Sequence, residues 1–370
     1  MKTSSEIRRT MQVPPTIHAP LPPTSYPAFD VAIYTDIGGR KHQEDRFTLC
    51  PKLLPDREDC AFFGVFDGTV GDFASENVKD LVVPQLISSP AWQRLVEIVR
   101  AAGPPQENSS SNSAAAASGG SGGAVGGGGS SSNASAAAVH RQQLDEKLPP
   151  LLEQAIDYMY RNADEELVQM CRQLNKDYAS STSVTAVLAD GFVGVGHLGD
   201  SRIAMGVQTP HSMSYEFLTV DHKPDMPHEK LRIIRHGGSV EYLHNHNNKP
   251  FIRGGDFSYR KSRGEQPMQL QYSRAFGGKD LKVYGLSNQP DVRIVKLTPQ
   301  HRVMILATDG LWDVMTAQQA IDVAMQARKE GRHPAQALVE TTLAEQQSRN
   351  QSADNITAMT VFFKRAADGV

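Results

Sequence analysis

The chain has 370 residues, 39% of them hydrophobic, which suits one large domain or two ordinary ones with a sizeable core. Its formal net charge of −3 at pH 7 gives no indication that nucleic acid or an anionic membrane is the main partner. The 3 cysteines are an odd number without paired spacing, which argues against a disulfide scaffold and favours a reducing compartment.

The N-terminal segment 1–27 is rich in Pro, Ser and Thr, and we expect it to form a flexible arm. It has no apolar run typical of a signal peptide, and no stretch of the sequence is long and apolar enough to span a membrane. We therefore expect a cytoplasmic or nuclear protein.

Residues 28–365 are predicted to form a single domain, interrupted by a Gly/Ser/Ala-rich insertion at 103–138. The composition of this insertion cannot bury enough apolar surface to offset the entropy lost on ordering, so we expect it to be disordered. The predicted strands are 29–35, 46–50, 61–66, 180–189, 191–198, 202–207, 215–220, 302–308 and 355–363. One predicted helix begins near residue 72. The other predicted helices span 149–175, 227–235, 317–329 and 334–347. Antiparallel-type strands with helices inserted between them favour an α+β fold.

Four aspartates at the ends of predicted strands carry the functional signal. Apolar runs end at Asp67, Asp200 and Asp309, and Asp354 stands just before the last strand. Each aspartate alone is more often a turn or capping residue. Four such carboxylates brought together without cations would repel one another strongly in a poorly solvated site. The pattern therefore indicates an all-oxygen site for Mg²⁺ or Mn²⁺.

Further motifs occur in a fixed order along the chain. They are GGRKHQEDRF from Gly38, VFDG from Val65, STSVTAVL from Ser181, GDSR from Gly199, DHKP from Asp221, GGSV from Gly237, SRAFGG from Ser273, DGLWDVM from Asp309 and DN from Asp354. This set resembles the metal-dependent serine/threonine protein phosphatases of type 2C (the PPM family). The resemblance implies a central sandwich of two antiparallel β-sheets flanked by α-helices on both faces, with the metal site at one end.

The resemblance also implies a role for each matching residue. Two Mg²⁺ or Mn²⁺ ions are implied, with a weaker third. The implied ligands are Asp67 bridging two ions, the Gly68 carbonyl on one, Asp309 and Asp354 on the other, and Asp200 with Asp313 at the third.

Residues around these ligands complete the implied site. An arginine beside a metal site is a natural phosphate clamp, because guanidinium is planar, permanently charged and bidentate. The resemblance assigns this role to Arg40. Glu44 would hold a metal-bound water, and Asp45 and Asn355 would lie around the ligands.

The implied activity is hydrolysis of phosphoserine and phosphothreonine in proteins, by direct attack of a metal-bridging water. The expected partners are phosphorylated protein substrates and no nucleic acid, and we expect a monomer. A calcium-binding structural protein is disfavoured, because the carboxylates are spread along the chain instead of gathered in one calcium loop.

One departure from the family pattern bears on the chemistry. The family has Asp-Gly-His-Gly-Gly, whereas this chain has Thr69 and Val70 after Asp67-Gly68. The missing histidine is the family's general acid, and a threonine hydroxyl does not exchange a proton near pH 7. His42 or His222 could take its place, but a surface or structural role is favoured for either. An alternative function is therefore a pseudophosphatase or slow phosphatase that acts as a phosphoprotein-binding regulator.

The polar segment 244–266 is longer than the family pattern requires. Two interpretations are open for it: a flap near the site that tunes substrate choice, or a neutral surface insertion.

Overall fold

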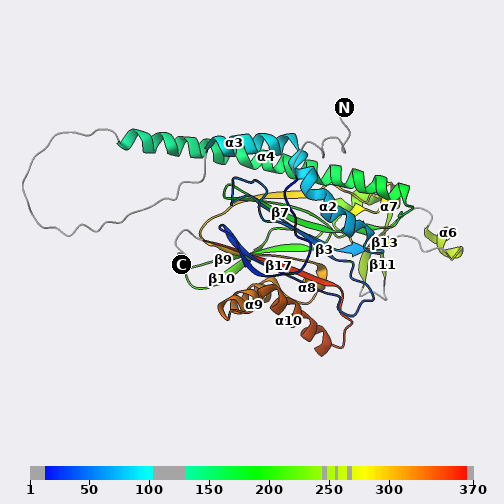
Figure 1. Ribbon diagram of the computed structural model, residues 1–370. Helices are drawn as coiled ribbons and strands as arrows, with labels where there is room; N and C mark the ends of the chain where they lie inside the picture. The colour runs from blue at the N-terminus through cyan, green and yellow to red at the C-terminus, as the bar shows by residue number, and fades with distance from the viewer. Residues whose placement is uncertain (1–12, 103–129, 244–247, 255–256, 265–268, 365–370) are drawn as a thin grey trace, which may run out of the picture.

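The computed structural model describes residues 13–102, 130–243, 248–254, 257–264 and 269–364. Two antiparallel β-sheets pack face to face, and helices cover both outer faces (Figure 1). The six-stranded sheet has the order β1 (Leu21–Ser25), β2 (Phe29–Asp36), β17 (Ile356–Phe363), β16 (His301–Ala307), β9 (Arg202–Gln208) and β10 (Met213–Phe217). The five-stranded sheet has the order β15 (Asp291–Lys296), β8 (Phe192–Leu198), β7 (Ser183–Ala189), β4 (Ala61–Phe66) and β3 (Arg46–Cys50).

The helices form two outer layers. The five-stranded sheet is covered by α2 (Phe73–Ser88), α3 (Pro90–Ala102) and α4 (Ser130–Gln173), and the six-stranded sheet by α9 (Ala317–Lys329) and α10 (Pro334–Ser348). This layered arrangement confirms the predicted α+β sandwich. Within the described parts of the chain, no helix combines the length and apolar character needed to cross a membrane.

The position of strand β4 between the helices and the second sheet explains why its sequence is uniformly apolar. Successive side chains of a strand point to opposite faces. Phe62 and Phe66 pack toward the helices, whereas Phe63 and Val65 pack in the core between the two sheets. All four side chains are fully buried, so both faces of the strand must be apolar. The strand is thereby a rigid support for Asp67, which follows it directly.

Smaller elements lie beside the sandwich. A small sheet combines β11 (Ser239–Leu243), β12 (Lys249–Arg253) and β13 (Gln269–Leu270), and another combines β14 (Phe276–Gly277), β6 (Ser180–Ser181) and β5 (Gly68–Thr69). The short helices are α5 (Pro227–Arg235), α6 (Phe257–Ser262), α7 (Lys279–Lys282) and α8 (Asp309–Trp312).

The prediction of a flexible N-terminal arm is wrong for part of the segment. β1 pairs with β2, and the backbone of Ile17 exchanges hydrogen bonds of 2.7 and 3.0 Å with Leu49. The side chains of Ile17, Leu21 and Tyr26 pack against the core between the sheets. These spaced apolar side chains contribute enough burial to order the arm. Residues 1–12 lie outside the described part of the chain.

The predicted boundary between the insertion and the following helix is also wrong. Helix α4 begins at Ser130, well before the predicted start at Pro149, so residues 130–138 are helical. This stretch follows the last glycine of the insertion and contains four alanines, which have the highest helix propensity. Pro149 and Pro150 lie inside the helix instead of opening it. Residues 103–129 are outside the described ranges.

Candidate metal and active site

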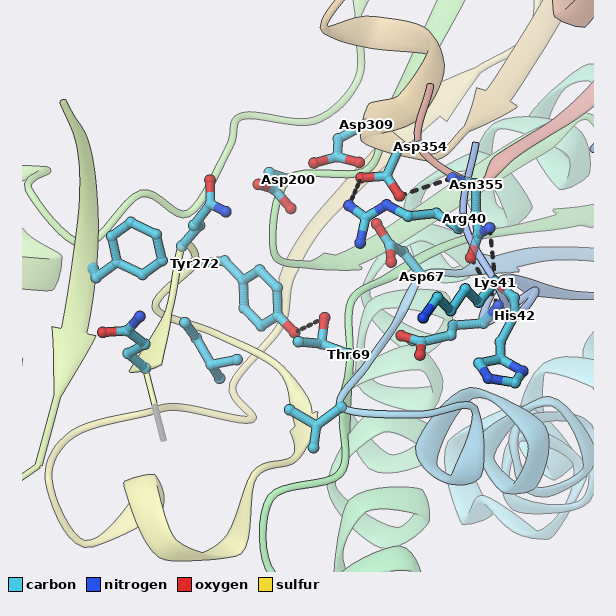
Figure 2. A pocket seen from close by; sticks show the side chains of 17 residues that line it. Arg40, Lys41, His42, Asp67, Thr69, Asp200, Tyr272, Asp309, Asp354 and Asn355 are labelled. Carbon is cyan, nitrogen blue, oxygen red and sulfur yellow. Dashed lines mark hydrogen bonds and ion pairs between the residues drawn. The ribbon is translucent and has the colours of Figure 1, made fainter. Parts of the chain in front are cut away.

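Five of the six predicted metal ligands, all except Asp313, converge on one pocket of about 530 Å³ at the end of the sandwich (Figure 2). Asp67 follows β4, Asp200 lies in the turn between β8 and β9, Asp309 comes two residues after β16, and Asp354 precedes β17. All four side chains line the pocket, as does Gly68. The antiparallel strands end together at this edge, which explains how distant parts of the sequence meet here.

The carboxylates are close enough to affect one another electrostatically. Burial in the surrounding protein, followed by the charge of Asp309, raises the pKa of Asp67 well above its usual range. Burial and then the charges of Asp200 and Asp313 do the same to the pKa of Asp309. Such a cluster is stable in the ionised form only beside positive charge. The all-oxygen donor set therefore fits hard divalent cations such as Mg²⁺ or Mn²⁺.

Gly68 occupies a position with no room for a side chain. A Cβ atom built on it would lie 2.6 Å from the Glu44 carbonyl oxygen and 2.7 Å from Ser75 Oγ. Glycine therefore allows the backbone to pass close to the segment that carries Glu44.

Asp200 and Asp313 are each paired with a lysine. Lys223 Nζ contacts Asp200 Oδ2, and Lys249 Nζ lies 2.9 Å from Asp313 Oδ2. Asp313 lines an adjacent pocket of about 340 Å³, together with Asp309, instead of the main pocket. A cation bound by Asp200 and Asp313 would have to compete with these two ammonium groups.

Asn355 ties the segment that carries Arg40 to the start of β17. Its Oδ1 accepts from the Glu44 backbone N–H at 2.8 Å, and its Nδ2 donates to the carbonyls of Ile37 at 2.9 Å and His42 at 3.0 Å. Arg40 Nη2 donates to Asp354 Oδ2 at 2.6 Å, and the arginine side chain is 58% exposed. The guanidinium group is thus held at the pocket mouth beside the carboxylates (Figure 2).

The neighbouring acidic residues Glu44 and Asp45 lie in two different environments. Glu44 lines the pocket, and its Oε1 accepts from the Gly71 backbone N–H at 3.2 Å. Burial is the largest cause of the raised pKa of Glu44. Asp45 is buried behind the pocket, where burial raises its pKa to about 7 and its Oδ2 accepts from Thr308 Oγ1 at 3.0 Å. Glu44 can therefore reach a molecule in the pocket, whereas Asp45 supports the pocket wall.

The two histidines considered as replacements for the missing general acid lie in different places. His42 lines the pocket. His222 is buried outside it, where its Nδ1 accepts from the Gly199 backbone N–H at 3.1 Å and its Nε2 lies 3.2 Å from Asp291 Oδ2. His222 therefore has the structural role favoured for it from the sequence, because it supports the turn before Asp200 from behind.

Part of the pocket wall comes from residues that no sequence motif indicates. Phe251 of β12, Leu270 of β13 and Tyr272 line the pocket. Phe251 belongs to the segment 244–266, so this observation favours a flap beside the site over a neutral insertion. Residues 244–247, 255–256 and 265–268 lie outside the described ranges. Tyr272 immediately precedes the SRAFGG motif, and this adjacency is the feature of the sequence that points to Tyr272.

Behind the pocket, His197 stacks on His222 with ring centroids 4.4 Å apart. These two rings and Asp291 offer ligand atoms within 4.8 Å of one another. His197 Nε2 already lies 2.9 Å from the Val220 carbonyl oxygen, and both nitrogens of His222 have partners. We therefore interpret this cluster as structural.

The buried His197 predicts a loss of stability in mild acid. Burial lowers its pKa to about 4; the charged or titratable groups around it are His222, Asp291 and Arg274. In the unfolded chain a histidine has a pKa of about 6.5, so between about pH 6.5 and 4 the unfolded state binds a proton that the folded state does not. The free energy of unfolding is therefore highest above about pH 6.5 and falls as the pH is lowered toward about 4. At about 1.36 kcal/mol per pKa unit, the loss over this window is about 3 kcal/mol.

His197→Gln retains an N–H donor for the Val220 carbonyl but does not titrate. We expect urea unfolding between about pH 7.5 and 5 to show a shallower loss of the free energy of unfolding in this variant than in the wild type. His211→Gln, at an exposed position, is the matched control. Parallel pH dependences for His197→Gln and the wild type would contradict this assignment.

Comparison with known proteins places the chain in a family. The sequence model described as Protein phosphatase 2C matches residues 85–356. The chain therefore belongs to the protein phosphatase 2C family.

Individual relatives agree with this placement. Probable protein phosphatase 2C 6 of Arabidopsis thaliana is 33% identical over 194 residues, covering 50% of this chain and 36% of the relative. Probable protein phosphatase 2C 41 of the same plant is 35% identical over 187 residues, covering 50% of this chain and 51% of the relative. The matched regions thus span about a third to a half of these curated relatives.

Solved structures give the same result for the fold. The crystal structure of serine-threonine phosphatase 2C from Toxoplasma gondii is 76% identical, covers 95% of this chain and 100% of that chain, and superposes with a TM-score of 0.83. A sex determining protein of C. elegans is 17% identical, covers 93% of this chain and 67% of that chain, and has a TM-score of 0.59. The second likeness concerns the fold alone.

Proposed function

We propose that the chain is a metal-dependent protein serine/threonine phosphatase whose substrates are phosphorylated proteins. The observation that carries the proposal is the convergence of Asp67, Asp200, Asp309 and Asp354 on one pocket with Arg40 at its mouth. The family and the printed name of the Toxoplasma structure support the same activity.

In this proposal, Asp67, the Gly68 carbonyl, Asp309 and Asp354 would hold two cations. Asp200 and Asp313 would hold a weaker third. When bound, Mg²⁺ or Mn²⁺ supplies positive charge at the phosphate and lowers the pKa of an attacking water. Glu44 lines the pocket and would accept a hydrogen bond from a water molecule there.

Arg40 binds the phosphate oxygens after exchanging its contact with Asp354 for them. We further propose direct attack of water on phosphorus, without a phosphoenzyme. In support, no serine or cysteine is among the described residues that line the pocket.

The proposal is tested by phosphate release from a phosphothreonine peptide in Mn²⁺, in Mg²⁺ and after chelation with EDTA. We expect release with either cation and none in EDTA. Equal release in EDTA would contradict a metal-dependent reaction. The comparisons give no support to a pseudophosphatase, and the complete set of carboxylates argues against one.

Arg40 provides a prediction about phosphate binding. A hydrogen bond to a charged group contributes about 1.5–3 kcal/mol, so Arg40→Ala should raise the KM for a phosphopeptide about 10- to 100-fold. The KM of Arg40→Lys should lie between those of the wild type and Arg40→Ala, because lysine keeps the charge but not the bidentate geometry. Steady-state kinetics at saturating Mn²⁺ measures the effect.

The control is Arg349→Ala, because the guanidinium group of Arg349 pairs with Glu345 on α10. This variant should leave KM unchanged. If Arg40→Ala also left KM unchanged, Arg40 would not bind the phosphate.

A further inference from the structure

A chain of three hydroxyl groups ends at the pocket wall. Tyr272 Oη donates to Thr69 Oγ1 at 2.9 Å (Figure 2). The same Oη lies 3.0 Å from Ser180 Oγ. Thr69 and Ser180 are directly opposite each other in the antiparallel pair β5–β6. Opposite residues of such a pair place their side chains on the same face, so one tyrosine can contact both.

Counting hydrogens gives this chain a direction. A tyrosine hydroxyl has a single hydrogen, and that of Tyr272 goes to Thr69. Ser180 must therefore be the donor in its contact with Tyr272. Thr69 Oγ1 already accepts from Tyr272, so its own hydrogen is available to point elsewhere. Thr69 and Tyr272 both line the pocket, which makes the pocket the natural direction for that hydrogen.

Burial alone does not account for this arrangement. Tyr272 is 5% exposed and Ser180 is fully buried, so each needs a partner, and the contact between them supplies one. The additional bond from Tyr272 runs to Thr69, which is partly accessible and stands two residues after Asp67. In Figure 2, Asp67 lies between Arg40 and Thr69. Arg40, Asp67 and Thr69 line the same pocket, so a phosphate held by Arg40 would share that pocket with the Thr69 hydroxyl.

We propose that Tyr272 is a positioning residue that orients the Thr69 hydroxyl as a hydrogen-bond donor toward the leaving oxygen of a bound phosphoester. The proposal rests on the phosphatase function proposed above. No proton is transferred: the hydroxyl stabilises negative charge that develops as the bond from phosphorus to oxygen breaks. A fixed donor of this kind is effective because it needs no reorientation during the reaction.

The leaving oxygen should be distinguishable from the other phosphate oxygens by kinetics. An alkyl leaving group, as in phosphothreonine, develops a concentrated charge on that oxygen. An aryl leaving group delocalises the charge into its ring and depends less on a donor. Loss of the oriented donor should therefore slow alkyl phosphoesters more than aryl phosphoesters.

The test compares Tyr272→Phe with the wild type on a phosphothreonine peptide and on 4-nitrophenyl phosphate, at saturating Mn²⁺. We expect kcat to fall about 10-fold on the peptide and about 2-fold or less on the aryl phosphate, with KM nearly unchanged. Thr69→Val removes the donor itself and should change the ratio of the two rates in the same direction. In the Thr69→Val background, Tyr272→Phe should have no further effect, because it acts through Thr69.

Tyr215→Phe, at a half-exposed tyrosine on β10, is the matched control and should leave both rates unchanged. Equal losses on the two substrates, no loss on either, or additive effects in the double variant would overturn the positioning role. If the wild type itself released phosphate from neither substrate, the proposed function would fail and this inference with it. An active wild type with an unchanged ratio in Tyr272→Phe would overturn the inference alone.

Discussion

Asp309→Asn should abolish metal-dependent phosphate release and, at the same time, make the metal-free protein more stable. The two effects have one cause: Asp309 supplies negative charge to a cluster that needs cations. We expect activity to fall by at least about 10³-fold, because the attacking water and the phosphate both lose stabilising charge. In EDTA, the free energy of unfolding should rise by about 1 kcal/mol or more, because one of several mutually repelling carboxylates is removed.

Phosphate release in Mn²⁺ and urea unfolding in EDTA measure the two effects on the same protein. The matched control is Asp322→Asn, which makes the same change at an exposed position of α9 and should alter neither quantity. A destabilised metal-free Asp309→Asn variant would show that the carboxylate makes favourable contacts instead of suffering repulsion. Retained activity would show that Asp309 is not needed to hold the cations.

Thr69→His should raise the turnover of phosphothreonine peptides, and raise it more than the turnover of aryl phosphates. The wild type has no group at position 69 that exchanges a proton near neutral pH, so we expect it to be faster on aryl phosphates than on phosphopeptides. A histidine there would add a general acid, which contributes typically about 10²- to 10⁴-fold. Part of this gain would be offset by loss of the hydrogen bond from Tyr272.

The measurement is kcat for both substrate classes in the wild type, in Thr69→His and in Thr69→Val. The valine variant reports loss of the hydroxyl without gain of an acid. Unchanged phosphopeptide turnover in Thr69→His would show that protonation of the leaving group does not limit the proposed reaction.

Several elements could be predicted because their signal is local. The capping box of Thr316 and Gln319 predicts a helix over 317–329, and both of its hydrogen bonds are present at the start of α9. The apolar runs before Asp67 and Asp309 predict buried strands, because strands covered on both faces need apolar residues at every position. The convergence of the aspartates followed from their common position at strand ends.

Other features depend on long-range contacts that no local pattern reveals. Aspartate is a common N-cap residue, but the side chain of Asp72 at the start of α2 makes no cap hydrogen bond. Its Oδ2 instead lies 2.6 Å from Arg46 Nη2 on the neighbouring strand β3. The ordered arm depends on the partner of Ile17 in β3, and the role of Tyr272 depends on a threonine more than 200 positions earlier in the sequence. In each case a contact with a distant part of the chain decides the outcome over the local preference.

The central claim is that the carboxylate cluster holds the cations on which hydrolysis depends. Its most direct test is a Mn²⁺ titration of the metal-free chain in which bound metal and phosphate release from a phosphothreonine peptide are measured on the same samples. We predict that release rises together with occupancy of the cluster, and that Asp67→Asn loses metal binding and release together. Release at zero occupancy, or full occupancy of an intact chain without any release, would contradict the account.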